Sequence, residues 1–256
     1  MKNIRKLASP NFNDRAGGVQ PNILILHYTG TATGLEAEEY YMNRKADPNA
    51  GPISPHYMIE RDGLVTQFVE EISRSWHAGK SWWDGEQDIN SHSIGIELVN
   101  PGHDKGYLDF TPEQMESLSE LVKDILTRND IPPHRILGHS DIFPHVTKDR
   151  VKPDPGEKLN WSWLADEGIG LWPRPTQDDY DMAAVLYGDP VSLRQAFTEY
   201  GYDPNGSDTE IIAAFQRHFQ PEAYTQKREG TADKDTAARL HWLLKTKNAY
   251  SSFPGP

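Results

Sequence analysis

The stretch from Gly138 to Gly156 reads GHSDIFPHVTKDRVKPDPG and carries three side chains suited to metal or charge chemistry. His139 and Asp154 offer ligand atoms that a zinc ion accepts, and Lys152 beside them can stabilise negative charge. A catalytic zinc takes three protein ligands and keeps one position for water. The stretch supplies two ligands, so a third must come from elsewhere in the chain.

The chain has 256 residues, a formal net charge of -12 and no cysteine. This length allows one large domain or a medium domain with a small one. The acidic balance argues against nucleic acid as a partner, because a phosphate backbone requires a basic surface. Without cysteine, disulfides and thiolate ligands are excluded, so a metal must be held by His, Asp or Glu. No apolar run reaches the length of a signal-peptide core or a transmembrane helix.

Strand and helix patterns alternate over the first 160 residues, which predicts an α/β domain. The apolar run 22–27 ends in His27 and is typical of a buried central strand. A helix is expected from residue 111, because Thr111 and Gln114 form a capping box before an amphipathic pattern. The remaining predicted elements are a helix at 35–44, a hairpin of 56–60 with 64–69, and strands at 93–99 and 135–138.

The composition changes near Trp161, and the pattern that follows residue 176 is helical. Residues 161–176 contain three tryptophans among glycines and prolines, and we interpret them as a linker that packs on the first domain. Further helices are predicted from Ser207, which opens a capping box, and at 236–244. We therefore expect a domain of residues 1–176, including an N-terminal arm and the linker, and a small helical bundle of residues 177–256.

His27 is the candidate for the third ligand, and with His139 and Asp154 it makes a set without thiolate that suits a catalytic zinc with an open position. A lone His at the end of a strand is, however, more often a structural residue. Glu97 lies within an apolar strand, where a buried carboxylate needs a partner or a function. It alternates with Ile and Leu, so a solvent-facing carboxylate is an equal alternative from spacing alone.

Several other side chains have two interpretations. Lys152 belongs either to the site or to a solvated loop. Residues 76–79 and His92 are candidates for the lining of a cleft. Trp82 and Trp83 beside them either stack on sugar rings or belong to the core.

Six motifs occur in order and together resemble one enzyme family. They are ILHYT (25–29), SPHYMI (54–59), WHAG (76–79), SIGIE (93–97), GHSDI (138–142) and KPDPG (152–156). In this combination residues 20–165 resemble the zinc-dependent N-acetylmuramoyl-L-alanine amidases of the amidase_2 family, relatives of the peptidoglycan recognition proteins. The segment AFQRHFQP (214–221), with Gly230, Asp233, Thr236 and Leu240 after it, resembles a three-helix peptidoglycan-binding domain.

The resemblance implies a mixed central sheet flanked by helices, followed by a C-terminal three-helix bundle. It implies hydrolysis of the amide between N-acetylmuramic acid and L-alanine in peptidoglycan or muropeptides. One zinc ion would be held by His27, His139 and Asp154, with Glu97 as the base and Lys152 stabilising the oxyanion. The substrate-binding positions that it implies are Tyr28, His56, Trp76, His77, His92 and Asn100.

The resemblance leaves alternatives for function and location. A non-catalytic peptidoglycan-binding protein and a zinc peptidase that cuts within the stem peptide are the competing functions. Action at the cell envelope or periplasm is expected, with cytoplasmic recycling of muropeptides as the alternative. The sequence does not indicate an oligomeric state.

The segment between GHSDI and KPDPG is about five residues longer than is usual for the family. The extra residues place Lys148 and Asp149 at the usual distance from His139, so they compete with Lys152 and Asp154. We prefer Lys152 and Asp154 because the neighbouring prolines restrict the backbone and hold both side chains at defined angles.

Overall fold

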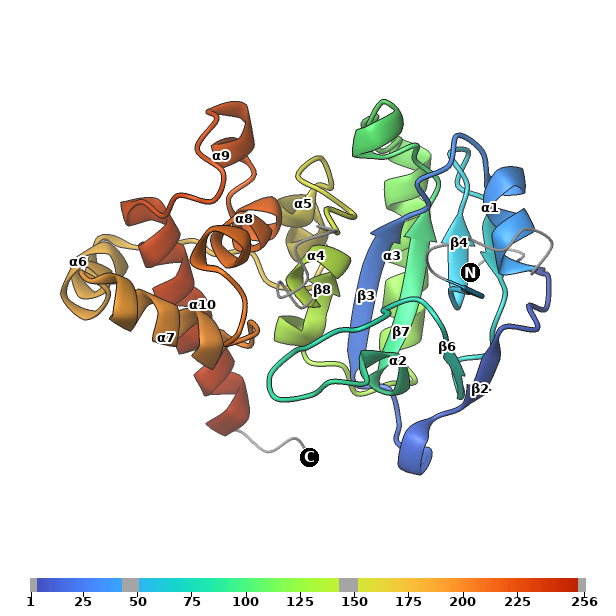
Figure 1. The fold of residues 1–256 in the computed structure, drawn as a ribbon, viewed down its shortest axis with the longest axis horizontal. Helices are drawn as coiled ribbons and strands as arrows, with labels where there is room; N and C mark the ends of the chain where they lie inside the picture. The colour runs from blue at the N-terminus through green and yellow to red at the C-terminus, as the bar shows by residue number, and fades with distance from the viewer. Residues whose placement is uncertain (1–3, 43–50, 143–151, 253–256) are drawn as a thin grey trace.

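A six-stranded mixed sheet forms the centre of the first part of the chain (Figure 1). The computed structural model describes residues 4–42, 51–142 and 152–252. The strand order is β1-β5-β4-β7-β3-β8, in which β4, β7, β3 and β8 run parallel and β5 is antiparallel to β4. The strands of this sheet are β1 (Arg5–Lys6), β3 (Ile23–Tyr28), β4 (Tyr57–Ile59), β5 (Val65–Gln67), β7 (Ser93–Leu98) and β8 (Ile136–Gly138). The predicted α/β class, the hairpin and the buried strands are thereby confirmed.

The central strand β3 is buried on both faces of the sheet, because its side chains alternate between two hydrophobic clusters. Leu24 and Leu26 pack with the apolar face of α3 (Pro112–Leu126), which lies behind the sheet in Figure 1. Ile23 and Ile25 face the opposite side and join a cluster that includes the C-terminal helices. The predicted start of α3 is confirmed, since Thr111 and Gln114 form the capping box.

Shorter elements complete the first part of the chain. A separate antiparallel pair consists of β2 (Phe12–Asp14) and β6 (Ser73–Ser75), and the helices are α1 (Gly34–Tyr41), α2 (Ile89–His92), α4 (His139–Ile142) and α5 (Trp161–Asp166). Single 3₁₀ turns lie at Ala16–Gly18, His103–Lys105 and Pro133–Arg135. The expected linker packs on the first domain through Trp161 and Leu164, yet it begins as a helix because the Asn160 side chain caps α5.

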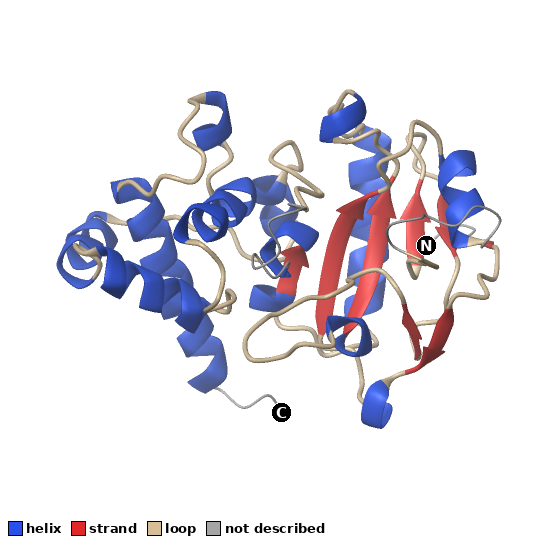
Figure 2. Ribbon diagram, viewed as in Figure 1, coloured by secondary structure: helices blue, strands red, loops and turns tan. Residues whose placement is uncertain are grey.

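The second part of the chain is helical, as predicted (Figure 2), and its described residues, 177–252, form five helices where three were expected. They are α6 (Gln177–Leu186), α7 (Pro190–Tyr200), α8 (Asp208–Phe219), α9 (Glu222–Thr225) and α10 (Lys234–Ser252). These helices lie beyond the edge strand β8 and share one buried cluster with the sheet, to which Ile25, Trp83, Ile142, Tyr202 and Phe215 belong. A continuous apolar core therefore crosses the expected boundary at residue 176.

None of the helices within the described residues combines the length and apolar character that crossing a bilayer requires.

Candidate metal centre

The candidate site lies at the carboxyl ends of three neighbouring parallel strands, where ligands bind in many α/β sheets. His27 of β3 is in register with Glu97 of β7, so both side chains project from the same face of the sheet. His139 follows directly after Gly138, the last residue of β8 on the other side of β3. Parallel strands that end together thus bring three chemically active side chains to one edge.

Asp154 reaches the same point from the loop that follows the undescribed segment. The Ser140 N–H donates to the main-chain oxygen of Asp154 at 2.9 Å, which ties this loop to the start of α4. Gly138 allows the close approach, because a Cβ there would lie 2.9 Å from the ring of Pro155. A side chain at position 138 would therefore push the loop away from His139.

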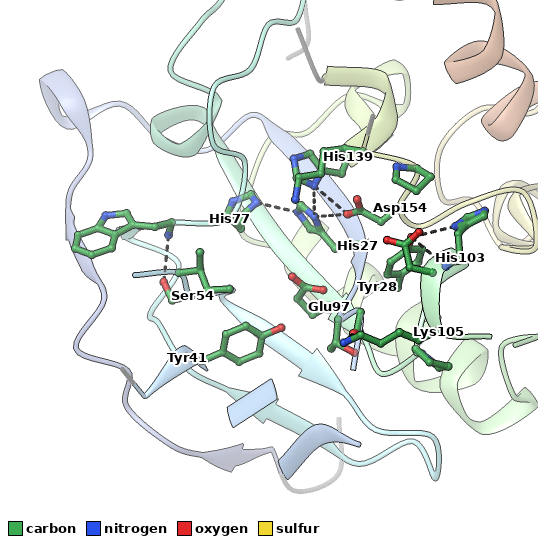
Figure 3. A pocket seen from close by; sticks show the side chains of 18 residues that line it. His27, Tyr28, Tyr41, Ser54, His77, Glu97, His103, Lys105, His139 and Asp154 are labelled. Carbon is green, nitrogen blue, oxygen red and sulfur yellow. Dashed lines mark hydrogen bonds and ion pairs between the residues drawn. The ribbon is translucent and has the colours of Figure 1, made fainter. Parts of the chain in front are cut away.

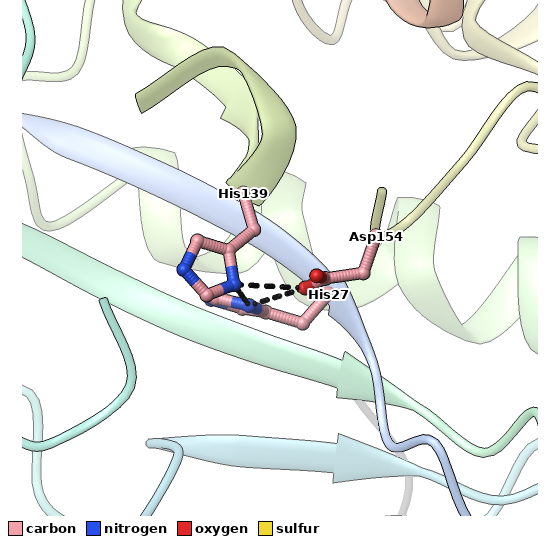
Figure 4. Close-up of side chains that lie close together, drawn as sticks. All are labelled: His27, His139 and Asp154. Carbon is pink, nitrogen blue, oxygen red and sulfur yellow. Dashed lines mark hydrogen bonds and ion pairs between the residues drawn. The ribbon is translucent and has the colours of Figure 1, made fainter. Parts of the chain in front are cut away.

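Three ligand atoms converge at this edge (Figure 4). His27 Nδ1 lies 3.0 Å from His139 Nδ1 and 3.0 Å from Asp154 Oδ2, and His139 Nδ1 lies 2.9 Å from the same Oδ2. All three residues are buried, with relative exposures of 1%, 6% and 6%. Bonds of 2.0–2.2 Å in a tetrahedral zinc site separate ligand atoms by about 3.3 Å, so these three atoms need to move apart by only a few tenths of an ångström to hold the ion.

The contact between His27 Nε2 and His77 determines that Nδ1 is the His27 atom available to a cation. His27 Nε2 lies 3.0 Å from His77 Nδ1, and His77 Nε2 lies 3.2 Å from the Ser93 hydroxyl. With the proton on Nε2, Nδ1 of His27 keeps its lone pair directed at the cluster. His77 can lie there because its ring occupies the space that a Cβ at position 95 would take, 2.5 Å away, and residue 95 is glycine.

The electrostatics of the cluster suit a cation. Burial lowers the pKa of His27 to about 4, and repulsion from His139 adds to the shift, so the imidazole is neutral at pH 7. Burial alone would raise the pKa of Asp154, but the charges and hydrogen bonds of His139 and His27 hold it well below its usual value. Two imidazoles and a carboxylate, without thiolate, are a donor set that fits a zinc ion.

Glu97 lies beside the cluster, and its carboxyl group has a raised pKa. Burial raises its pKa to about 8, the charge of Asp154 adds to the rise, and Lys152 opposes it. The Tyr41 hydroxyl donates a hydrogen bond to this carboxylate. The other oxygen, Oε2, is buried and has no protein partner among the described residues.

A cavity of about 590 Å³ opens above the cluster (Figure 3). Of the residues expected from the sequence, those that line it are His27, Tyr28, Trp76, His77, Glu97, His139, Lys152 and Asp154. The competing pair Lys148 and Asp149 falls outside the described residues. The structure therefore brings together the preferred ligand set, the expected base and the expected lysine.

Three further candidates, His56, His92 and Asn100, are not among the described residues that line the cavity. His56 is fully buried, where its Nδ1 accepts from the Gly95 N–H and its Nε2 faces the Ser73 carbonyl. His92 Nδ1 lies 2.8 Å from a Glu86 carboxylate oxygen.

The third of these, Asn100, organises the loop that follows β7. Its side chain donates to the Leu108 carbonyl and accepts from the N–H groups of Gly102 and Leu108. That loop carries His103 and Lys105 to the rim of the cavity, so Asn100 shapes the rim from below.

Sequence reasoning missed several cavity residues. Tyr41 belongs to α1 and is 2% exposed, and its position resembles that of any core tyrosine on a helix. His103 stacks on Tyr107 with ring centroids 4.2 Å apart and bonds to both the Tyr28 hydroxyl and Glu157. The only available signal was the polar composition of the segment 102–105, which is typical of many surface loops.

Comparisons with known proteins agree with this geometry. AmiD of Escherichia coli, an N-acetylmuramoyl-L-alanine amidase, is 34% identical over an alignment that covers 87% of this chain and 82% of AmiD. The 1,6-anhydro-N-acetylmuramyl-L-alanine amidase AmpD of Haemophilus influenzae is 32% identical over 63% of this chain and 90% of its own. The crystal structure of AmpDh3 from Pseudomonas aeruginosa in complex with anhydromuramic pentapeptide superposes with a TM-score of 0.74, at 30% identity, over 96% of this chain and 98% of that one.

The fold and the site define a hydrolase with a candidate metal centre at the carboxyl edge of a mixed sheet. The N-acetylmuramoyl-L-alanine amidase family, Amidase_2, matches residues 17–157, and the chain belongs to this family. Its activity is hydrolysis of the amide between N-acetylmuramic acid and L-alanine. This catalytic assignment is favoured over a non-catalytic binding protein.

Proposed function

We propose that the chain is a zinc-dependent amidase acting on peptidoglycan fragments, with His27, His139 and Asp154 as the metal ligands. The observation that carries this proposal is the convergence of two Nδ1 atoms and one carboxylate oxygen within 4.8 Å of one another at the cavity floor. When bound, zinc would lower the pKa of a water molecule from about 16 towards about 7 and polarise the scissile carbonyl. His77 would keep His27 in the tautomer that presents Nδ1 to the metal.

Glu97 acts in this proposal as general base and then as general acid. The raised pKa, about 8, makes its ionised form a stronger base than an ordinary glutamate, and a bound cation would favour that ionised form at neutral pH, so that it accepts a proton from the attacking water. It then donates that proton to the nitrogen of the leaving L-alanine. The products are the sugar with a free lactyl carboxylate and the peptide with a free amine. Glu97 Oε2 has no protein partner among the described residues, so this oxygen is available to the attacking water in the proposal.

Lys152 stabilises the negative charge that develops on the carbonyl oxygen. It lines the cavity together with Glu97 and Asp154, and it lowers the pKa of Glu97 through its positive charge. A preorganised donor of this kind is worth about 3 kcal/mol in the transition state. Of the other residues that line the cavity, Tyr28, Trp76 and His103 would contact the sugar and the first residues of the stem peptide.

We further propose that the substrate is a peptidoglycan fragment carrying an intact stem peptide, acted on at the cell envelope. The E. coli AmiD structure in complex with anhydro-N-acetylmuramic acid-L-Ala-D-gamma-Glu-L-Lys, which superposes on this chain with a TM-score of 0.72, supports a fragment of this kind. Digestion of a soluble anhydromuropeptide followed by mass spectrometry tests the bond. Release of the whole stem peptide from the sugar supports the amidase, whereas a cut inside the peptide would identify a zinc peptidase.

The division at residue 176 and a wall-binding role for residues 177–256 complete the proposal. Wall binding by a second contact site raises the effective concentration of the enzyme at its substrate. The test uses the full chain carrying Glu97→Gln, retained on insoluble peptidoglycan, with soluble muropeptide added as a competitor. Retention that persists at saturating competitor supports a second contact site, and complete release would contradict it.

A further inference from the structure

We propose that His218 and Tyr202 of the C-terminal helices are positioning residues for the catalytic centre, because they hold Asp141 in the turn that carries His139. The inference rests on the proposed function in one respect, namely that His139 binds the metal. It gives residues 177–256 a second role beside wall binding. This role acts through buried hydrogen bonds and needs no contact with substrate.

The turn between β8 and α4 sets the place of two ligands at once. Asp141 Oδ2 accepts the N–H of Gly138 at 2.8 Å, three residues earlier, and so closes the strand-to-helix turn around His139. The Ser140 N–H of the same turn binds the main-chain oxygen of Asp154. A shift of this turn therefore moves the imidazole of His139 and the backbone of Asp154 together.

The C-terminal helices supply the other hydrogen bonds to Asp141. His218 Nδ1, on α8, lies 2.8 Å from Oδ2, and the Tyr202 hydroxyl donates to Oδ1 at 2.8 Å. The side chain of Asp141 is fully buried and that of His218 is 2% exposed, so water does not take the place of these donors. A buried carboxylate that loses a donor carries an unsatisfied lone pair and shifts towards another partner.

Packing fixes both donors in place. The His218 ring stacks on Trp161 and on Phe219, with centroids 3.7 Å away in each case. Its Nε2 is buried without a protein partner among the described residues, which leaves Nδ1–H as the productive donor. Tyr202 packs edge-on against the buried Trp83 at 5.1 Å. The residues that tether the two parts of the chain are thus the same ones that order the turn.

A domain that served only as a tether would not need this arrangement. A tether needs only a linker between the two parts of the chain. The hydrogen bonds of His218 and Tyr202 instead reach Asp141, two positions from the proposed metal ligand His139. Residues of this kind behind a metal site typically change metal affinity by about 10-fold to 100-fold when they are altered. The prediction is therefore a loss of zinc affinity caused from the C-terminal helices.

The test compares four variants of the full chain. His218→Phe keeps the ring stack and removes the donor, Tyr202→Phe removes one hydroxyl, and His218→Asn restores an amide donor near Nδ1. Lys247→Met is the matched control, because Lys247 bonds across the same interface to Asp84, a residue outside α4. Zinc affinity is measured by competition with a chelator, kcat and KM are measured on a soluble anhydromuropeptide, and folding is followed by thermal melting.

We expect His218→Phe and Tyr202→Phe to weaken zinc affinity about tenfold and to lower kcat more than they change KM, with recovery in His218→Asn. Lys247→Met should lower only the melting temperature. Wild-type zinc affinity and kcat in both Phe variants, or an equal loss in Lys247→Met, would overturn the positioning role. If His218→Phe does not fold, Tyr202→Phe decides alone. Wild-type protein that binds no zinc would instead refute the proposed function.

Discussion

Replacing Glu97 with glutamine should abolish turnover while making the protein more stable. Both effects follow from the same feature, a half-buried carboxylate whose pKa desolvation raises to about 8. The substitution keeps the shape of the side chain. Tyr41 can still donate to the remaining carbonyl oxygen, so the cavity wall keeps its geometry.

The loss of activity has a magnitude set by proton transfer. A positioned general base contributes about 10²-fold to 10⁴-fold, so kcat should fall by that factor while KM changes little. The equivalent increase of the barrier is about 3–5 kcal/mol, because each factor of ten corresponds to 1.36 kcal/mol. The metal ligands are unchanged, so zinc content should remain that of the wild type.

The gain in stability follows from the direction of the pKa shift. An acid whose pKa is higher in the folded state binds more protons when folded, so ionisation above the unfolded value of 4.5 destabilises the fold. pH 7 lies about 2.5 units above the unfolded pKa of 4.5. This difference corresponds to at most about 3 kcal/mol of unfolding free energy that Glu97 removes from the metal-free protein. Solvation of the carboxylate by cavity water reduces this figure.

The assay combines rates on a soluble anhydromuropeptide with denaturant unfolding of the metal-free protein. The matched control is Asp104→Asn, which removes a carboxylate from the cavity rim and should leave the rate within a few-fold of wild type. A Glu97→Gln protein with wild-type kcat would refute the role of Glu97 as base. Lower stability in this variant would refute the account of its buried charge.

Three other predictions follow from particular contacts. Tyr41→Phe should lower kcat several-fold and shift the pH profile of kcat/KM, because Glu97 loses its donor; an unchanged profile would leave Tyr41 without this role. Burial lowers the pKa of His56 from 6.5 to about 3, so the unfolded state binds more protons between these values and stability falls as pH falls. Wild type should therefore lose about 2 kcal/mol more unfolding free energy than His56→Gln between pH 7 and pH 5 in denaturant titrations, and equal losses would contradict this. Asp154→Ala should lose bound zinc while Asp149→Ala keeps it, and metal analysis giving the reverse would move the third ligand to Asp149.

Much of the fold could be predicted because apolar runs and capping residues have local causes. The strand that ends in His27 was recognisable as buried by composition. The strand that contains Glu97 was recognisable as a strand, but a solvent-facing Glu97 remained an equal alternative. Their parallel pairing, which sets the two side chains on one face, follows from the sheet order. The resemblance to a family implied a mixed central sheet but no strand order, so this pairing was not predicted.

The contacts that sequence could not predict join distant segments. Asp141 and His218 are separated by 77 residues, and no local pattern marks either as a partner of the other. The place of Tyr41 in the cavity could not be predicted either, since a tyrosine on the inner face of a short helix is usually a core residue. His56 illustrates the converse, because the motif that contains it suggests a substrate contact while its hydrogen bonds belong to the core.

The most direct test of the central claim is zinc content measured together with amide hydrolysis on the same preparation. Wild-type protein should contain one zinc ion per chain, lose activity when the metal is removed by a chelator, and regain it when zinc is returned. The product should be free stem peptide with an L-alanine amino terminus, identified by mass. Full activity in a preparation verified to be metal-free would contradict the account.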